Sequence, residues 1–138
     1  MSRNFAWLPY HPGHVTLVPF QANMNILTGW MSGCWLALVS VGGASYFAHV
    51  GTETNAQHPS TIAVKNGIKI AIGAGVMTVQ RAFQMICQGS PNTLGCVSVN
   101  RHFYTLGLSM SPTSKGAMKM RIDSKTRIVP QPGLPSGY

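Results

Sequence analysis

A cysteine and a histidine, Cys34 and His49, stand at matching positions in two neighbouring apolar runs. These runs predict strands over about residues 34–41 and 45–50, joined by a tight turn at Gly42-Gly43. Cys34 opens the first strand and His49 lies near the end of the second. Antiparallel pairing would therefore bring the thiol and the imidazole to the same end of a sheet, which is the arrangement of a cysteine nucleophile and its general base.

The alternative interpretation is that both residues belong to an ordinary core. Free cysteine is among the most buried residue types, and a strand histidine is often simply hydrogen-bonded. The preceding Ser32-Gly33 pair favours the functional interpretation, because a turn there can expose the thiol and direct backbone N–H groups at an oxyanion. Glu53 and Asp123 are outside candidates for orienting the imidazole, and Glu53 is closer to His49 in the chain.

The composition excludes several other chemistries. The chain has 138 residues, which suits one domain, with ten Lys and Arg, two acids and a formal net charge of +8. Two carboxylates are too few for a carboxylate-rich magnesium or calcium site, and a glycosidase would need both of them at one bond. No zinc-ligand spacing occurs, and His11 and His14 give only a weak metal signal. We expect no metal and no cofactor.

The positive charge also suits a different class of protein, a basic module that binds nucleic acid or an acidic partner without catalysis. In that case the cluster formed by Lys115, Lys119, Arg121 and Arg127 would carry the binding. The other basic residues are dispersed and no known nucleic-acid motif is present, so a solvated basic surface that aids solubility or attraction to an acidic partner is the better account of the charge.

A membrane span is not expected. Trp30 to Val50 contains 21 residues without charge, but glycines and serines interrupt it and Gly42-Gly43 lies at its middle. The N-terminal sequence contains Pro9 and Pro12 and lacks a long apolar segment, so it does not resemble a conventional signal peptide.

The predicted fold class is α+β, with a central β-sandwich or mixed sheet and one or two flanking helices. Residues 1–129 are predicted to form a single catalytic domain, and the Pro/Gly-rich residues 130–138 a mobile tail. The remaining predicted segments, in chain order, are an irregular leader (1–13), a strand (14–20), a turn (23–31), a loop (51–59), a helix capped by Ser60 and ending near 72, a short helix (77–87), a loop (88–95), a hairpin of strands 96–99 and 102–108 turning at Asn100-Arg101, and a strand (117–122).

The other two cysteines, Cys87 and Cys96, bracket the predicted loop at 88–95. They could form a disulfide in an oxidising compartment, which would leave Cys34 as the free thiol. All three could equally be reduced, behaving as small apolar residues.

Ser32-Gly33-Cys34, followed fifteen positions later by His49, resembles the signature of the cytotoxic-necrotizing-factor catalytic domain. The chemoreceptor glutamine deamidases of bacterial chemotaxis share this Cys/His arrangement. In several members a threonine six residues before the cysteine completes the site, and here that residue is Thr28. The resemblance covers about residues 14–55, including His49-Val50-Gly51-Thr52. The Gly-rich ending of the chemotaxis members is not evident, which favours the toxin branch.

The resemblance implies a cysteine-dependent protein glutamine deamidase with Cys34, His49 and Thr28 as catalytic residues and with transglutamination as a side activity. It also implies a bacterial effector, secreted or injected into a target cell, that modifies a protein with an accessible glutamine, such as a small GTPase. A secretion carrier or a cognate inhibitor would be further partners. Another Cys/His amidase or peptidase remains an alternative, beside the basic binding module.

Overall fold

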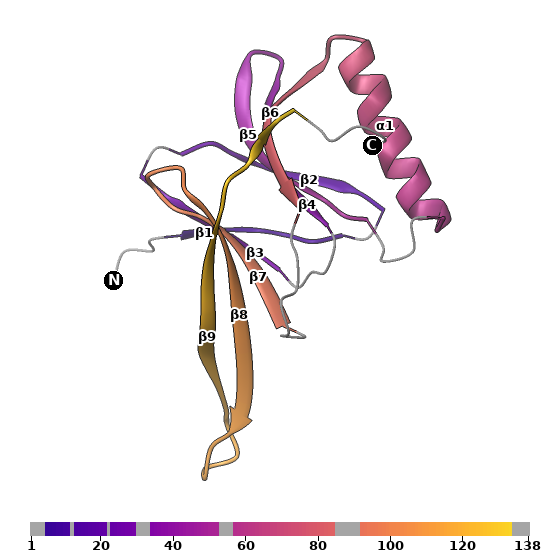
Figure 1. Ribbon diagram of the computed structural model, residues 1–138. Helices are drawn as coiled ribbons and strands as arrows, with labels where there is room; N and C mark the ends of the chain where they lie inside the picture. The colour runs from indigo at the N-terminus through magenta and orange to yellow at the C-terminus, as the bar shows by residue number, and fades with distance from the viewer. Residues whose placement is uncertain are drawn as a thin grey trace.

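The part of the chain that the structure describes forms two five-stranded β-sheets and one helix (Figure 1). The computed structural model describes residues 5–11, 13–21, 23–29, 34–52, 57–84 and 92–133. The predicted α+β class, with a sheet and a flanking helix, is confirmed. No helix in the described ranges is long and apolar enough to cross a membrane.

The first sheet has the order β1-β3-β7-β8-β9. Its strands are antiparallel neighbours except for β1 and β3, which run parallel. The strand bounds are β1 Phe5–Leu8, β3 Asn25–Thr28, β7 Asn92–Val97, β8 Phe103–Pro112 and β9 Met118–Ile128.

The second sheet has the order β10-β6-β4-β5-β2 and is antiparallel throughout. Its strand bounds are β2 Val15–Pro19, β4 Trp35–Val41, β5 Ala44–Val50, β6 Met77–Gln84 and β10 Gln131–Pro132. The predicted strands at 34–41 and 45–50 are confirmed. Gly42 and Gly43 make the turn between them with φ of 59° and 84°, values that glycine adopts without steric cost.

Two hydrophobic clusters hold these layers together. The first lies between the sheets and makes the fold a β-sandwich; its buried members are Leu8, Ile26, Val97 and Phe103 from the first sheet and Cys34, Leu36, Phe47 and Phe83 from the second. The second cluster lies on the other face of the second sheet, where Val64 and Ile68 of the helix α1 (Pro59–Gly73) pack on Trp35 and Val39. Because the first residues of β4, Trp35 to Ala37, are buried on both faces, the start of the strand is firmly positioned.

The short helix predicted at 77–87 is wrong, since residues 77–84 form β6. The pairing of β6 with β4 shifts between Leu38 and Val39, so that Leu38 faces Arg81 while Val39 faces Val79. Gln80 is thus an extra residue in a β-bulge. The bulge interrupts the two-residue alternation and gives the apolar residues of β6 a spacing that imitates a helix.

Two predictions for the N-terminal third are also wrong. The leader predicted as irregular contains β1, and the turn predicted at 23–31 contains β3. Both strands have only four residues, and each is stabilised by pairing with the other and by the packing of Leu8 and Ile26, both 0% exposed. Such strands depend on distant partners, which a local pattern does not reveal.

The remaining boundaries differ in detail. The helix begins at Pro59, and His58 rather than Ser60 is its N-cap, with the His58 ring accepting from the Ser60 N–H. The loop predicted at 88–95 overlaps β7, which starts at Asn92. Gln131 and Pro132, predicted to belong to a tail, pair with β6 as β10; residues 134–138 lie outside the described residues. The hairpin at Asn100-Arg101 and the strand at 117–122 are confirmed, the latter as part of β9.

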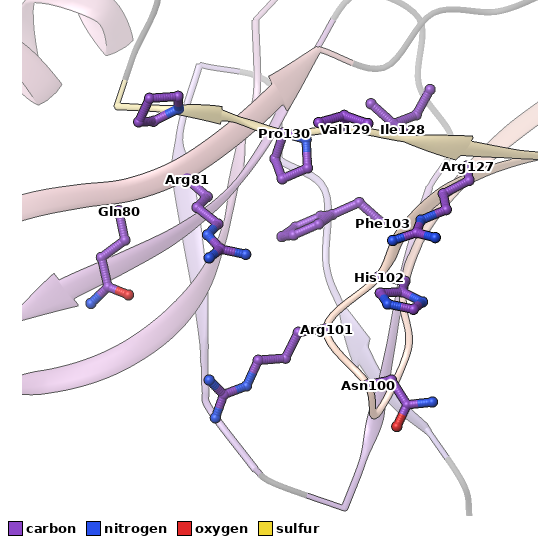
Figure 2. A pocket seen from close by; sticks show the side chains of 11 residues that line it. Gln80, Arg81, Asn100, Arg101, His102, Phe103, Arg127, Ile128, Val129 and Pro130 are labelled. Carbon is purple, nitrogen blue, oxygen red and sulfur yellow. The ribbon is translucent and has the colours of Figure 1, made fainter.

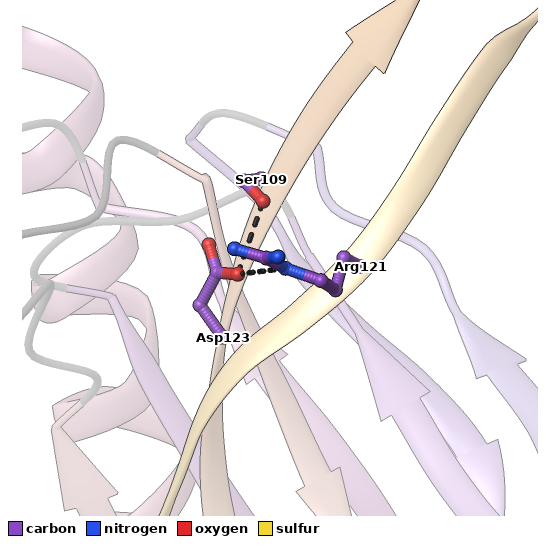
Figure 3. A network of polar contacts seen from close by, with 3 residues as sticks. All are labelled: Ser109, Arg121 and Asp123. Atoms are coloured by element: carbon purple, nitrogen blue, oxygen red, sulfur yellow. Dashed lines mark hydrogen bonds and ion pairs between the residues drawn. The ribbon is translucent and has the colours of Figure 1, made fainter. Parts of the chain in front are cut away.

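The β8–β9 hairpin continues beyond Asn92, the first residue of β7, as a two-stranded arm (Figure 1). On this arm Arg121 Nε lies 2.8 Å from Asp123 Oδ1, and the Ser109 hydroxyl donates to the same oxygen at 3.1 Å (Figure 3). The hydrogen bond from Arg121 lowers the pKa of the Asp123 carboxyl. The Asp123 carboxylate therefore binds side chains of the arm and does not orient His49.

Candidate active site

The sheet register places Cys34 and His49 on one face. His49 lies directly opposite Leu36, and Trp35 opposite Val50. Opposed residues in antiparallel strands point to the same side, and so do residues two apart in one strand. Cys34 and Leu36 accordingly share the face of His49, which looks into the sandwich. Cys34 is 2% exposed and His49 0% exposed, so both lie within the protein interior.

Thr28 joins this pair from the opposite sheet. Its hydroxyl oxygen lies 2.7 Å from His49 Nδ1 and 2.7 Å from the carbonyl oxygen of Leu8. A carbonyl can only accept, so the single hydroxyl proton goes to Leu8. The hydroxyl oxygen must then accept from the imidazole, which places the proton on Nδ1 and the lone pair on Nε2. This contact defines the tautomer in which Nε2 is the basic nitrogen.

The surroundings of His49 keep the ring uncharged. Burial lowers the pKa of its imidazole from 6.5 to about 4, so the ring is neutral at physiological pH. The Tyr10 ring stacks on the imidazole with centroids 5.0 Å apart and an interplanar angle of 27°. Within the described part of the chain, Nε2 is buried and makes no hydrogen bond. A neutral imidazole with an unsatisfied Nε2 is ready to accept a proton.

The Cys34 thiol donates to the backbone carbonyl of Thr52 at 3.1 Å. It therefore shares a face with His49 without being hydrogen-bonded to Nε2. Catalytic hydrogen bonds are commonly long or misaligned before substrate binds. Because the Thr52 carbonyl already receives the thiol proton, a change in the thiol's orientation is needed for transfer to His49.

Gly51 fixes the strand end that carries Thr52. Its N–H donates to the carbonyl of His14 at 2.9 Å, and its own carbonyl accepts from Gly13 N–H at 2.8 Å. A Cβ atom at this position would lie 2.3 Å from the His11 carbonyl oxygen, which is closer than a Cβ and an oxygen atom can approach. Only glycine allows the His11–His14 turn to rest against the end of β5, and this contact positions the acceptor of the Cys34 thiol.

The structure thus brings Thr28 and His49 into contact and places Cys34 on the same face. Glu53, the Ser32-Gly33 turn and Cys87 lie outside the described residues. Cys96 is a free thiol in β7, and burial raises its pKa. No group of three metal-ligating side chains occurs in the ranges that the structure describes.

Three participants were missed by the sequence reasoning: the Leu8 carbonyl, the Thr52 carbonyl and the Tyr10 ring. Backbone carbonyls carry no signature in a sequence. Tyr10 lies 39 positions before His49, and the two rings meet only because β1 and β2 fold beside β5. A lone tyrosine between prolines gave no signal for that contact.

No protein-family model and no curated protein sequence matches this chain. The geometry of Thr28, Cys34 and His49 is therefore the basis for assigning a function.

The low pKa of His49 predicts a pH-dependent stability. The imidazole titrates near 6.5 when unfolded and near 4 when folded, so between these values the unfolded chain binds the extra proton. The free energy of unfolding should be constant above this window and fall as the pH drops through it, by on the order of 3 kcal/mol in total. Urea denaturation at a series of pH values measures the slope. The slope should persist in His11→Gln and flatten in His49→Gln; an unchanged slope in His49→Gln would contradict the assignment.

Proposed function

We propose that this protein is a cysteine-dependent protein glutamine deamidase. The observation that carries the proposal is the 2.7 Å contact between Thr28 Oγ1 and His49 Nδ1, which leaves Nε2 unprotonated on the face shared with Cys34. This is a nucleophile, a base and a group that orients the base, assembled from three strands or strand ends.

The proposed reaction begins when Cys34 gives its proton to His49 Nε2. The thiolate attacks the side-chain carboxamide carbon of a substrate glutamine, forming a carbon–sulfur bond and a tetrahedral oxyanion. Backbone N–H groups at Cys34 and the turn before it would stabilise that charge. Protonated His49 then donates to the amide nitrogen, the carbon–nitrogen bond breaks and ammonia leaves. A thioester between Cys34 and the substrate remains.

Hydrolysis completes the cycle. His49 takes a proton from water, the hydroxide attacks the thioester carbon, and the proton returns to the departing Cys34 sulfur. The products are glutamate and the free thiol. If an amine replaces water, the same step transfers the acyl group and gives a transglutaminase side activity. Thr28 keeps the imidazole in one tautomer throughout and is a positioning residue.

The wider biological proposal is an effector toxin, secreted or injected, that modifies a target-cell protein such as a small GTPase. Its support is the resemblance of Ser32-Gly33-Cys34 and His49 to the necrotizing-factor domain, together with the basic surface. A net charge of +8 suits attraction to an acidic partner and speeds association with it.

The proposal is tested by incubating the protein with a target-cell extract and measuring ammonia and modified peptides. The wild type should release ammonia and convert particular glutamines to glutamates. Mass spectrometry detects this conversion as the small increase in peptide mass that results when a side-chain NH2 group is replaced by OH. Pretreatment with iodoacetamide should stop both, because alkylation removes the nucleophile. New peptide termini in place of glutamates would instead identify a peptidase. Because Cys34 is buried, its alkylation is verified by mass spectrometry, and ammonia release that survives complete alkylation of Cys34 would disprove a thiol mechanism.

A further inference from the structure

A pocket lies between the two sheets, away from Cys34. It has a volume of about 650 Å³, within the range of small-molecule sites. Three segments form it: β6, the turn between β7 and β8, and the chain from the end of β9 to β10 (Figure 2). Its charged and polar lining is Arg81, Arg101, Arg127, His102, Gln80 and Asn100.

The pocket is positive and has an apolar wall. In Figure 2 the Phe103 ring lies between Arg81 and Arg127, with Pro130 beside it. A narrower recess of about 130 Å³ shares Arg81, Arg101 and Phe103 and extends inward to Leu38 and Phe47. A bound molecule would thus meet guanidinium groups together with aromatic and aliphatic carbon.

No described carboxylate neutralises these arginines. Asp123 is the only carboxylate side chain among the residues that the structure describes. It pairs with Arg121 at 2.8 Å on the hairpin arm. Arg81, Arg101 and Arg127 are exposed, so solvent screens part of their mutual repulsion, and together they give the pocket a positive potential. An anion removes that repulsion, which makes an anionic ligand the natural occupant.

The backbone conformation of Arg101 also indicates that this pocket binds a ligand. Its φ is 63°, and within the described ranges it is the only residue other than glycine with a positive φ. The turn is closed by Arg101 N–H to Ser98 O at 2.8 Å and by Ser98 N–H to His102 O at 2.9 Å. Glycine or asparagine ordinarily fills such a left-handed hairpin position. An arginine there carries a conformational cost, partly offset by its guanidinium 4.8 Å from the centroid of the Phe20 ring.

The pocket is separate from the candidate active site. On the first sheet, Thr105 lies across Gly95 from Thr28, and Arg101 comes four residues before Thr105. Arg101 lies in the turn that precedes β8, so its backbone lies beyond the start of that strand, while Thr105 lies within it. On the second sheet, Arg81 faces Leu38, which is four residues beyond Cys34. Both sheets therefore place the arginines toward the opposite end of the sandwich.

We propose that this pocket binds a small organic phosphate that carries more than one phosphate charge. Guanidinium groups match phosphate oxygens with paired hydrogen bonds, and three of them exceed the need of a single carboxylate. A pocket of about 650 Å³ with an apolar wall suits a compact ligand with an apolar or ring-shaped body rather than a long polymer, which requires an extended groove. This site is independent of the deamidation chemistry and does not require it.

The test is isothermal titration calorimetry with inorganic tripolyphosphate, and with adenosine triphosphate as a probe that adds a ring. Both should bind wild type in about 0.15 M salt, where weak surface attraction is screened. Arg101→Gly should weaken the binding of each by about tenfold or more, because charge-assisted hydrogen bonds are lost. The matched control is Lys119→Ala, which removes the same charge from the exposed β9 arm and should leave the binding unchanged.

Thermal unfolding separates this role from a structural one. Glycine is relaxed at the φ of residue 101, so Arg101→Gly should keep or raise the melting temperature while it loses phosphate binding. Arg127→Ala provides a second variant without a change of turn geometry and should also weaken binding. Equal loss in Lys119→Ala, or no binding by wild type, would overturn the proposal. Vesicles with and without a phosphoinositide distinguish a lipid head group from a free ligand as the source of the phosphates.

Discussion

Replacing Cys34 with serine should reduce ammonia release by at least about 10³-fold while leaving the fold intact. Serine has nearly the same shape and keeps a donor for the Thr52 carbonyl, which accepts from the thiol at 3.1 Å. The alcohol is a far weaker acid than the thiol, so a neutral His49 cannot generate its anion at a useful rate. Ammonia release measured with a glutamine-containing protein substrate gives the rate, and circular dichroism checks the fold.

The matched control for this experiment is Cys96→Ser. Cys96 lies opposite Leu27 in the first sheet, so it faces the side away from the inward-pointing Thr28. It packs instead with the separate cluster of Leu94 and Leu106. The control should therefore retain wild-type activity. Full activity in Cys34→Ser, or equal loss in Cys96→Ser, would rule out Cys34 as the nucleophile.

The central hairpin could be predicted because its signals are local. Apolar residues fill both strands, and a Gly-Gly pair supplies the positive φ that a tight turn needs. Antiparallel pairing alone predicts Cys34 and His49 at one end of a sheet, and the register places His49 opposite Leu36, two residues from Cys34. The sequence pattern does not reveal that the thiol donates to the Thr52 carbonyl or that, in the described part of the chain, His49 Nε2 has no hydrogen-bond partner.

Features that depend on long-range pairing could not be predicted. β6 was predicted as a helix because the bulge at Gln80 broke its alternation, and that bulge exists only through the pairing with β4. β1 and β3 are too short to show a pattern. The same limit applies to the site: Thr28 was proposed from a family resemblance, and nothing in its local sequence indicated the contact with His49 from the opposite sheet.

Thr28 is the residue whose replacement most directly tests how the base is oriented. In Thr28→Val the shape is kept but the hydroxyl is lost, so the Leu8 carbonyl and the His49 Nδ1–H both lose their partner. The imidazole is then free to carry its proton on Nε2, where it cannot act as a base. We expect kcat/KM to fall by about 10²-fold, within the usual contribution of general-base catalysis. Thr28→Ser restores the hydroxyl and should recover most of that loss.

A purely structural role for Thr28 makes a different prediction. If the hydroxyl only supported packing, Thr28→Val would lower stability and activity without changing the state of the imidazole, and Thr28→Ser would show no special recovery. Nitrogen NMR of labelled His49 distinguishes these cases, since the protonated and unprotonated ring nitrogens have different shifts. The wild type and Thr28→Ser should show the proton on Nδ1, and Thr28→Val a mixture. An Nδ1-protonated ring in Thr28→Val would mean that the tautomer is set by another group, and Thr28 would then lose its place in the mechanism.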